Sequence, residues 1–282
     1  MNRRISVYRL SALTVFAVSW LLSIVRIWVM EKNIEINDIS TGNVYFIEKN
    51  IETISFAVFS VCFTLAFIVL GIYLGKKANT MIDFENSPVV FSSALCGFML
   101  LAIGLYYSYQ YITTDRVGLG KFIVCLMMIA ASVMFLYLSI SKNGMKRTSL
   151  PVMRIIVCVY AIVRLVVDFI EQNSLPSNSA LVFHILSLIC FMLFMTYEGK
   201  SDFGEASMRF YLISGYLCVF FMMIFALPNL ILTLGDYSMI DSYVLFSAND
   251  IVIAFYVFTR VYSVTKAASE ESASKEKSDE NQ

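Results

Sequence analysis

The chain has few charged residues and a single histidine. Charged residues make up 15% of its 282 residues, whereas a typical soluble domain has about 25%. One histidine excludes a Cys/His zinc site and haem ligation by two histidines within this chain. The 21 basic and 21 acidic residues balance, so no nucleic-acid partner is indicated. Most of the chain therefore needs a lipid bilayer around it rather than water.

The motifs of common enzymes are missing as well. The sequence has no Ser/His/Asp set at usable spacing, no Walker loop, no H-E-x-x-H and no paired aspartates within a helix. No lysine lies in the middle of the last apolar stretches, which excludes a retinal Schiff base. No loop is long enough for a soluble catalytic or DNA-binding domain. An enzyme is therefore the least favoured class, and no metal or cofactor is predicted.

Hydrophobic residues, by contrast, make up 59% of the chain. A bilayer core needs about 20 consecutive apolar residues per helical span, and eight stretches approach this length. They are Leu10 to Met30, Ile54 to Leu74, Val89 to Tyr109, Phe122 to Ile140, Val152 to Ile170, Leu181 to Tyr197, Phe210 to Leu234 and Tyr243 to Val264. The sixth is short, and the eighth contains Asn249 and Asp250. The sequence predicts an all-α bundle of eight transmembrane helices in residues 1–266, followed by a disordered cytoplasmic tail in residues 267–282.

The distribution of Lys and Arg predicts the orientation of this bundle. With the N-terminus in the cytoplasm, fifteen Lys and Arg residues fall in inside segments and four in outside segments, as the positive-inside rule requires. Both termini are therefore predicted to be cytoplasmic.

The six cysteines each fall in a different apolar stretch, which predicts reduced packing residues rather than disulfides. The pair Gly71 and Gly75 forms a GxxxG pattern, which predicts close packing of the second span against another helix.

Short sequence matches suggest that the chain contains a repeat of four spans. Ile24-Val25-Arg26 in the first span matches Ile162-Val163-Arg164 in the fifth, and Cys62-Phe63 in the second matches Cys190-Phe191 in the sixth. Because four is an even number, the halves 1–142 and 143–266 would be related by an axis along the membrane normal. A 4+4 parallel repeat is the resulting hypothesis.

Part of the chain resembles a group of known sequences. The likeness lies in Arg164-Leu165-Val166-Val167-Asp168-Phe169, in Pro176, and in HILSLICFMLFMTYEGKSDFGE from His184 to Glu205. They resemble uncharacterised multi-pass membrane proteins of anaerobic Gram-positive gut bacteria, a group with no assigned activity. The likeness covers mainly the fifth to seventh spans. It implies a bacterial cytoplasmic membrane and nothing about chemistry.

Five ionisable residues from four spans fall in the predicted outer half of the bilayer. They are the ligand or ion candidates Arg26, Arg164, Asp168, His184 and Asp250. Intramembrane charges are costly unless they are paired, neutralised or hydrated. Asp168 lies four residues after Arg164 and can pair with it on one helical face. Arg164 and Asp250 lie deepest, which predicts an ion pair between the fifth and eighth spans.

Two functions remain open from the sequence. The first is a protein that binds or transports a small polar solute or ion through this outer charged cluster. The alternative is a non-catalytic structural or regulatory subunit, whose charges form an internal salt-bridge network and which contacts a membrane or cytoplasmic protein partner. In both cases the bilayer itself is the surrounding partner. A hydrated cluster favours the first function, and a dry, paired cluster favours the second.

Overall fold

The computed structural model contains eight long helices and one short β-hairpin. It describes residues 3–32, 34–38, 43–46, 51–75, 87–114, 118–140, 150–172, 179–203, 207–235 and 244–280. In chain order the elements are α1 (Arg3–Lys32), β1 (Ile34–Asp38), β2 (Asn43–Phe46), α2 (Ile51–Gly75), α3 (Ser87–Thr114), α4 (Leu119–Ile140), α5 (Leu150–Gln172), α6 (Ser179–Asp202), α7 (Met208–Leu234) and α8 (Val244–Glu280).

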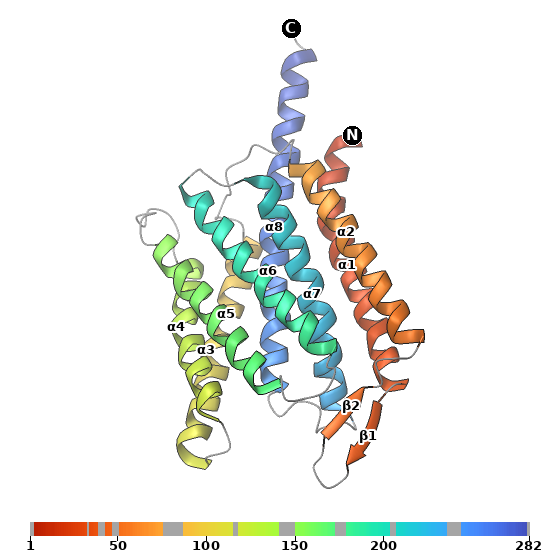
Figure 1. Cartoon of the computed structure of the whole chain (residues 1–282). Coiled ribbons are helices and arrows are strands. Elements are labelled where there is room, and N and C mark those ends of the chain that lie inside the picture. Colours follow the sequence, from red (N-terminus) through yellow and green to blue (C-terminus); the bar gives the residue numbers. More distant parts are fainter. Residues whose placement is uncertain are drawn as a thin grey trace.

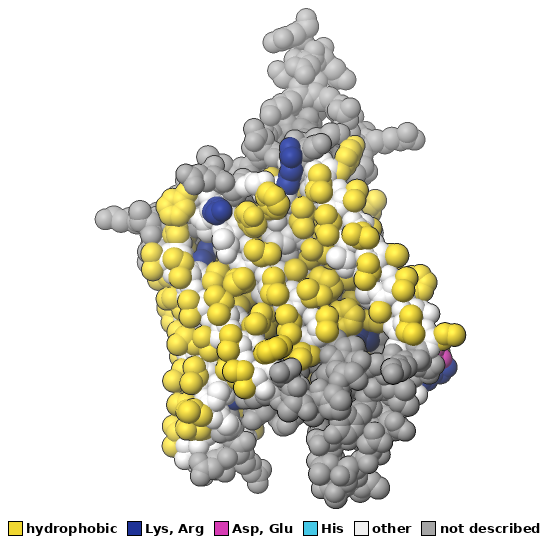
Figure 2. Space-filling view, viewed as in Figure 1, with side chains coloured by type: hydrophobic (Ala, Val, Ile, Leu, Met, Phe, Trp, Pro, Cys, Tyr) yellow, Lys and Arg dark blue, Asp and Glu magenta, His cyan; other side chains and the backbone are white. Residues whose placement is uncertain are grey.

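All eight helices are long and apolar enough to cross a membrane. The eight predicted spans are thus confirmed, including the short sixth and the polar eighth. The start of α1 and the end of α8 lie at the same end of the bundle (Figure 1), as an even number of crossings requires. Figure 2 shows a face covered mainly by hydrophobic side chains, and many large ones are exposed. The chain is therefore an integral, multi-pass membrane protein.

The β-hairpin lies between α1 and α2, at the end of the bundle opposite the termini (Figure 1). β1 and β2 pair antiparallel, with a register shift between Ile36 and Asp38. The strands have the sequences IEIND and NVYF, and β-branched and aromatic residues favour a strand.

Helix α7 lies in the interior of the bundle and organises it. It packs against α1 and α2 on one side and against α6 and α8 on the other. Helices α3, α4, α5 and α6 follow one another as neighbours around the remaining side (Figure 1). The most polar span, α8, is also largely enclosed, because α1, α3 and α7 all contact it.

Two glycines set the distance between α2 and α7. A Cβ atom on Gly71 would lie 2.6 Å from Cγ1 of Ile213, and one on Gly75 would lie 2.4 Å from Cα of Arg209. Both distances are too short for real atoms, so the two backbones are in direct contact at these positions. The close packing predicted from the GxxxG pattern is confirmed, with α7 as the partner helix.

All six cysteines are free thiols, as the sequence predicts. The 4+4 repeat, in contrast, is not confirmed by the helix packing. A two-fold arrangement would make the contact between α6 and α7 recur between α2 and α3. Among the described residues α6 packs extensively against α7, and no comparable contact joins α2 to α3.

The C-terminal segment differs from its prediction. Residues 267–280 continue α8 as a helix through Glu280, although the sequence predicts a disordered tail from residue 267. The segment contains four Glu, three Ala and two Lys residues, which are among the best helix formers. A helix already nucleated in the membrane extends at little cost, so composition alone underestimated its length.

Candidate functional site

A buried ion pair joins α5 and α8 in the half of the bundle that the sequence predicts to be outer. Nη1 and Nη2 of Arg164 donate hydrogen bonds to the two carboxylate oxygens of Asp250, the second at 2.7 Å. Asp250 is fully buried, and Arg164 is 3% exposed. Nη1 of Arg164 also donates to the hydroxyl of Tyr160 at 3.1 Å, one turn away on α5. The predicted pairing of the fifth and eighth spans is confirmed, in the bidentate geometry that suits a guanidinium and a carboxylate.

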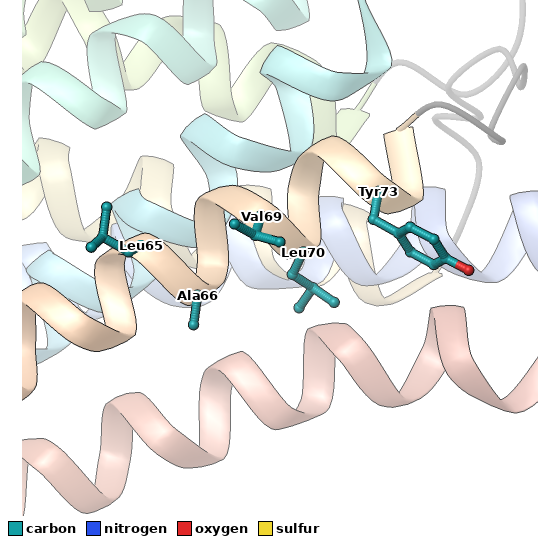
Figure 3. Close-up of a pocket in the computed structure, with 5 residues that line it drawn as sticks. All are labelled: Leu65, Ala66, Val69, Leu70 and Tyr73. Atoms are coloured by element: carbon teal, nitrogen blue, oxygen red, sulfur yellow. The ribbon is translucent and has the colours of Figure 1, made fainter.

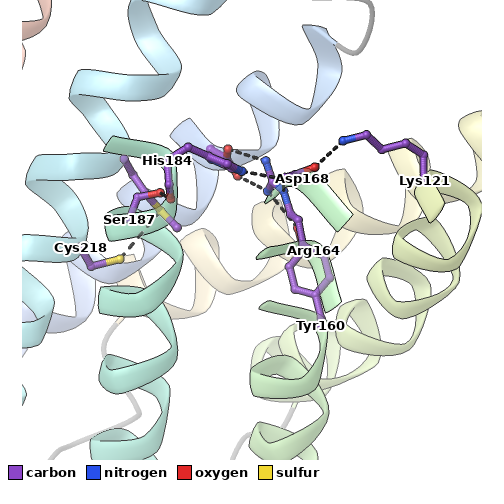
Figure 4. Close-up of polar contacts among 9 residues, drawn as sticks. Lys121, Tyr160, Arg164, Asp168, His184, Ser187 and Cys218 are labelled. Atoms are coloured by element: carbon purple, nitrogen blue, oxygen red, sulfur yellow. Dashed lines mark hydrogen bonds and ion pairs between the residues drawn. The ribbon is translucent and has the colours of Figure 1, made fainter. Parts of the chain in front are cut away.

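Asp168 is the centre of this cluster because cations and a histidine reach it from three helices. Lys121 of α4 forms a close ion pair with Oδ1. His184 of α6 places Nε2 2.6 Å from Oδ2, and Nε of Arg164 lies 3.4 Å from the same oxygen. Figure 4 shows these side chains pointing toward Asp168. We call Lys121, Arg164, Asp168, His184 and Asp250 the outer network.

The outer network is balanced in charge and enclosed by aromatic rings. Lys121 and Arg164 provide two positive charges, and Asp168 and Asp250 provide two negative charges, so the network is neutral when His184 is neutral. The ring of Phe246 lies 5.3 Å from the Arg164 guanidinium carbon and 5.6 Å from Nζ of Lys121. The ring of Phe225 lies 4.3 Å from the imidazole. The cluster is thus paired and shielded from water by its neighbours.

Arg26 does not join the outer network. Its Nη1 donates to the carbonyl oxygen of Ile224 on α7 at 2.7 Å, and its guanidinium carbon lies 4.7 Å from the ring of Phe183. The prediction that all five candidates converge is therefore wrong for Arg26 and correct for the other four. Helix α1 lies on the far side of α7 from α4 and α5, so a predicted depth similar to that of Arg164 did not bring Arg26 into contact with the network.

A second buried cluster, which we call the inner network, lies on the same helices, nearer the end of the bundle that holds the two termini. It consists of Arg154 of α5, Glu198 of α6, and Tyr256 and Arg260 of α8. Nε of Arg260 forms a close ion pair with Oε1 of Glu198, and Nη2 of Arg154 lies 4.0 Å from the same oxygen. The hydroxyl of Tyr256 donates to Glu198 at 3.3 Å. The three charged side chains are at most 1% exposed.

The two networks connect the same three helices at two depths. Ten residues separate Arg154 from Arg164 on α5, and ten separate Asp250 from Arg260 on α8. At 1.5 Å per residue, the two layers lie about 15 Å apart along the helix axes. The backbone of α8 packs mainly on α1, α3 and α7. Long charged side chains therefore bridge α8 to α5 and α6, whose backbones lie farther from α8 than those of its main neighbours.

Cys96 of α3 lies between these two layers. Tyr107 of α3 stacks on Phe246 of α8 near the outer network, with ring centroids 5.2 Å apart. Ser92 of α3 shares a 2.6 Å hydrogen bond with Thr259, next to the inner network. Since Cys96 falls between Ser92 and Tyr107 on α3, it lies at an intermediate depth. The side chain is fully buried, so its thiol reports on this level of the bundle.

Asn249 is a further polar side chain at the level of the outer network. It is fully buried, and neither atom of its amide group has a hydrogen-bond partner among the described residues. Asn249, Tyr256 and Arg260 are spaced at i, i+7 and i+11, so they project from one stripe of α8. Buried amides are almost always paired. This one leaves a donor and an acceptor available inside the bundle.

An open groove on α2 offers no comparable chemistry. Figure 3 shows its lining, which consists of Leu65, Ala66, Val69, Leu70 and Tyr73 on one face of the helix. None of these side chains is charged, and the groove suits hydrocarbon rather than a polar ligand. Within the described ranges, no cluster of His, Cys, Asp and Glu could hold a metal ion.

Sequence reasoning missed Lys121 and the inner network. Lys121 and Glu198 fall at the edges of their apolar stretches, where a charge normally reaches the headgroups. Both are instead buried, at 8% and 0% exposed. One signal was available, because Arg154, Glu198 and Arg260 lie in or beside the fifth, sixth and eighth spans, three of the four spans that carry the outer candidates. Charges that recur on the same three spans indicate a shared interface.

Comparison of the chain with protein families, curated proteins and solved structures finds no match. The functional argument therefore rests on the two networks.

Proposed function

We propose that the chain is a membrane transporter for a small polar solute or ion, in which the outer and inner networks are the two gates. The observation that carries this proposal is the repetition of buried ion pairs between the same helices, α5, α6 and α8, at two depths. In many secondary transporters one group of helices rocks against another around a site near the bilayer midplane. Here α1, α2, α7 and α8 would form one group and α3 to α6 the other, and the two groups would slide along the contacts of α7 with α6 and of α8 with α3.

The energetics of buried ion pairs favour a gate that opens over a contact that only stabilises the bundle. Removing two charges from water costs about as much as their attraction returns, so a buried pair adds little net stability. Separated charges regain their hydration when a water-filled vestibule opens beside them. Such a network can therefore have two states of similar free energy: a closed state with the charges paired, and an open state with the charges separated and hydrated. Two such networks, opened one at a time, would admit a solute from either side.

Asn249 and the deepest outer charges are the proposed solute contacts. The unpaired amide supplies one donor and one acceptor, Arg164 would hold an anionic group, and Asp250 a cation. We further infer a bacterial cytoplasmic membrane, from the resemblance above, and cytoplasmic termini, from the fifteen-to-four distribution of Lys and Arg.

The second candidate, a structural or regulatory subunit, is favoured by one specific observation. The outer network is buried and its charges are paired, as expected of side chains that only hold the helices together. The two candidates differ in motion: a subunit keeps both networks closed, and a transporter opens each in turn.

The thiol of Cys96 distinguishes them. In a variant whose other five cysteines are replaced by alanine, a small water-soluble thiosulfonate is applied to right-side-out and to inverted vesicles. If the protein is a transporter, Cys96 of the parent should be labelled slowly from both sides. Labelling should be several-fold faster from outside in Asp250→Asn, and several-fold faster from inside in Glu198→Gln. The matched control is Glu52→Gln, which breaks the exposed pair of Glu52 with Lys32 and should label like the parent. A Cys96 that stays unlabelled from both sides in every folded variant supports the structural subunit instead.

A further inference from the structure

His184 is held in one tautomer by its partner. Asp168 receives Lys121, Arg164 and the imidazole, and a carboxylate so surrounded by cations is ionised and can only accept. Nε2 of His184 must therefore carry the hydrogen, which leaves a lone pair on Nδ1. The contacts of Asp168 thus determine the tautomer of the only histidine in the chain.

Nδ1 is a buried basic atom without a function in the closed state. Among the described residues it has no hydrogen-bond partner, and the side chain is 2% exposed. The ring lies against Phe225 of α7, which offers no hydrogen-bonding atom. Histidine is also the side chain that ordinarily changes charge near neutral pH. An available lone pair on this residue type is a binding site for a proton.

We propose that Nδ1 of His184 binds a proton and that this proton opens the outer gate, which makes it the coupling ion of transport. The proposal rests on the transport function inferred above. The binding step is a simple protonation, in which a proton from the aqueous side attaches to the Nδ1 lone pair and the ring gains one positive charge.

The charges around the ring determine the direction of the effect. The imidazole contacts Asp168 of α5 and the Phe225 ring of α7. Asp168 also pairs with Lys121 of α4 and Arg164 of α5, and Arg164 pairs with Asp250 of α8. Without the proton two cations face two carboxylates, and with it three cations do. Arg26 of α1, against the neighbouring Phe183, adds a further positive charge nearby.

An imidazolium in this position has an unsatisfied N–H and a surplus of positive charge in a dry network. Both costs fall when water enters, because water accepts from Nδ1–H and hydrates the surplus charge. Proton uptake therefore favours the state in which the outer network is open. A histidine that serves only as a packing residue would have the same tautomer but would not couple its charge to any movement.

The single histidine allows a direct test. Protein labelled with ¹³C and ¹⁵N in histidine, purified through a tag without histidine and placed in lipid nanodiscs, gives one imidazole signal. At about pH 8 we expect protonated Nε2 and an imine-type Nδ1, and on acidification to about pH 5 the Nδ1 signal should change to the protonated form. An Nδ1–H tautomer at high pH, or an unchanged signal over this range, would overturn the proton site.

Labelling of Cys96 tests the coupling separately. Acidification lowers the thiolate fraction of Cys96 and so slows its labelling in both the parent and His184→Gln. In the parent, opening of the outer gate should partly offset this loss, so the labelling rate from outside should fall less than in His184→Gln. Equal pH dependence in the two folded proteins overturns the coupling, even if the imidazole titrates. A Cys96 that is never labelled, at any pH and from either side, instead refutes the transport function, and the imidazole signal then shows whether the proton site survives alone.

Discussion

The ion pair between Arg164 and Asp250 predicts an asymmetry between two single substitutions. Both hydrogen bonds that Asp250 makes among the described residues come from Arg164. Arg164→Gln therefore leaves a fully buried carboxylate without its cation, which should lower the free energy of unfolding by about 3–5 kcal/mol. Asp250→Asn should be milder, because Arg164 keeps Tyr160 at 3.1 Å and Asp168 at 3.4 Å, and we expect about 1.5–3 kcal/mol.

The double substitution separates an interaction from two independent effects. With both charges removed, no buried charge is stranded at this position, so Arg164→Gln with Asp250→Asn should cost less than the sum of the two singles. The coupling should reach the upper part of the ~0.5–3 kcal/mol range for residues in contact.

The assay is denaturant unfolding of the purified protein in mixed micelles, followed by the loss of helical circular dichroism. Glu52→Gln is the matched control. It breaks a pair whose Lys32 and Glu52 side chains are 49% and 29% exposed, so its effect should be about 0–1 kcal/mol. Equal losses for the two single variants, with additive behaviour of the double, would refute the interpretation of a buried, mutually dependent pair.

Three further predictions concern the fold. Gly75→Ala should cost about 1–3 kcal/mol in the same assay, because its Cβ would lie 2.4 Å from Cα of Arg209, whereas Gly118→Ala has open space around it and should be neutral; similar values for both would contradict the α2–α7 contact. Reporter fusions after Gly118 should report outside and those after Lys200 inside, and the reverse pattern would invert the predicted orientation. Electrophoresis of the monomer should give the same mobility with and without reductant, since all six cysteines are free; a shift would show an unexpected disulfide.

The helices were predictable because a membrane span is determined mainly by its own residues. Without water in the hydrocarbon core, an apolar stretch of sufficient length must satisfy its backbone as a helix. The outcome therefore depends little on which neighbours surround it. This is why even α6, whose apolar stretch is short, and the polar α8 were predicted correctly. The helical extension of α8 beyond residue 266 depends on continuity with the span, which composition does not record.

The pairing of Arg164 with Asp250 was predictable, but the direction in which each charged side chain points around its helix was not. Arg164 and Asp250 have opposite charge at similar depth, and their pairing follows from the cost of leaving either alone. Arg26 has a similar depth, but its partner is the backbone carbonyl of Ile224, and a carbonyl has no signature in the sequence. Lys121 and Glu198 were read as flanking charges, since the burial of a residue at a span edge depends on which helices cover it.

Distances between α5 and α8 at the two ends of the bundle test the central claim most directly. Spin labels at Ile170 and Leu245 report on the outer end, and labels at Val152 and Lys266 on the inner end, in a cysteine-free background in nanodiscs. Alternating gates predict that Asp250→Asn lengthens only the outer distance and Glu198→Gln only the inner one, with both populations present in the parent. A single narrow distance distribution at each end, unchanged by either substitution in folded protein, would contradict the alternating gates. The two networks would then only stabilise a rigid bundle.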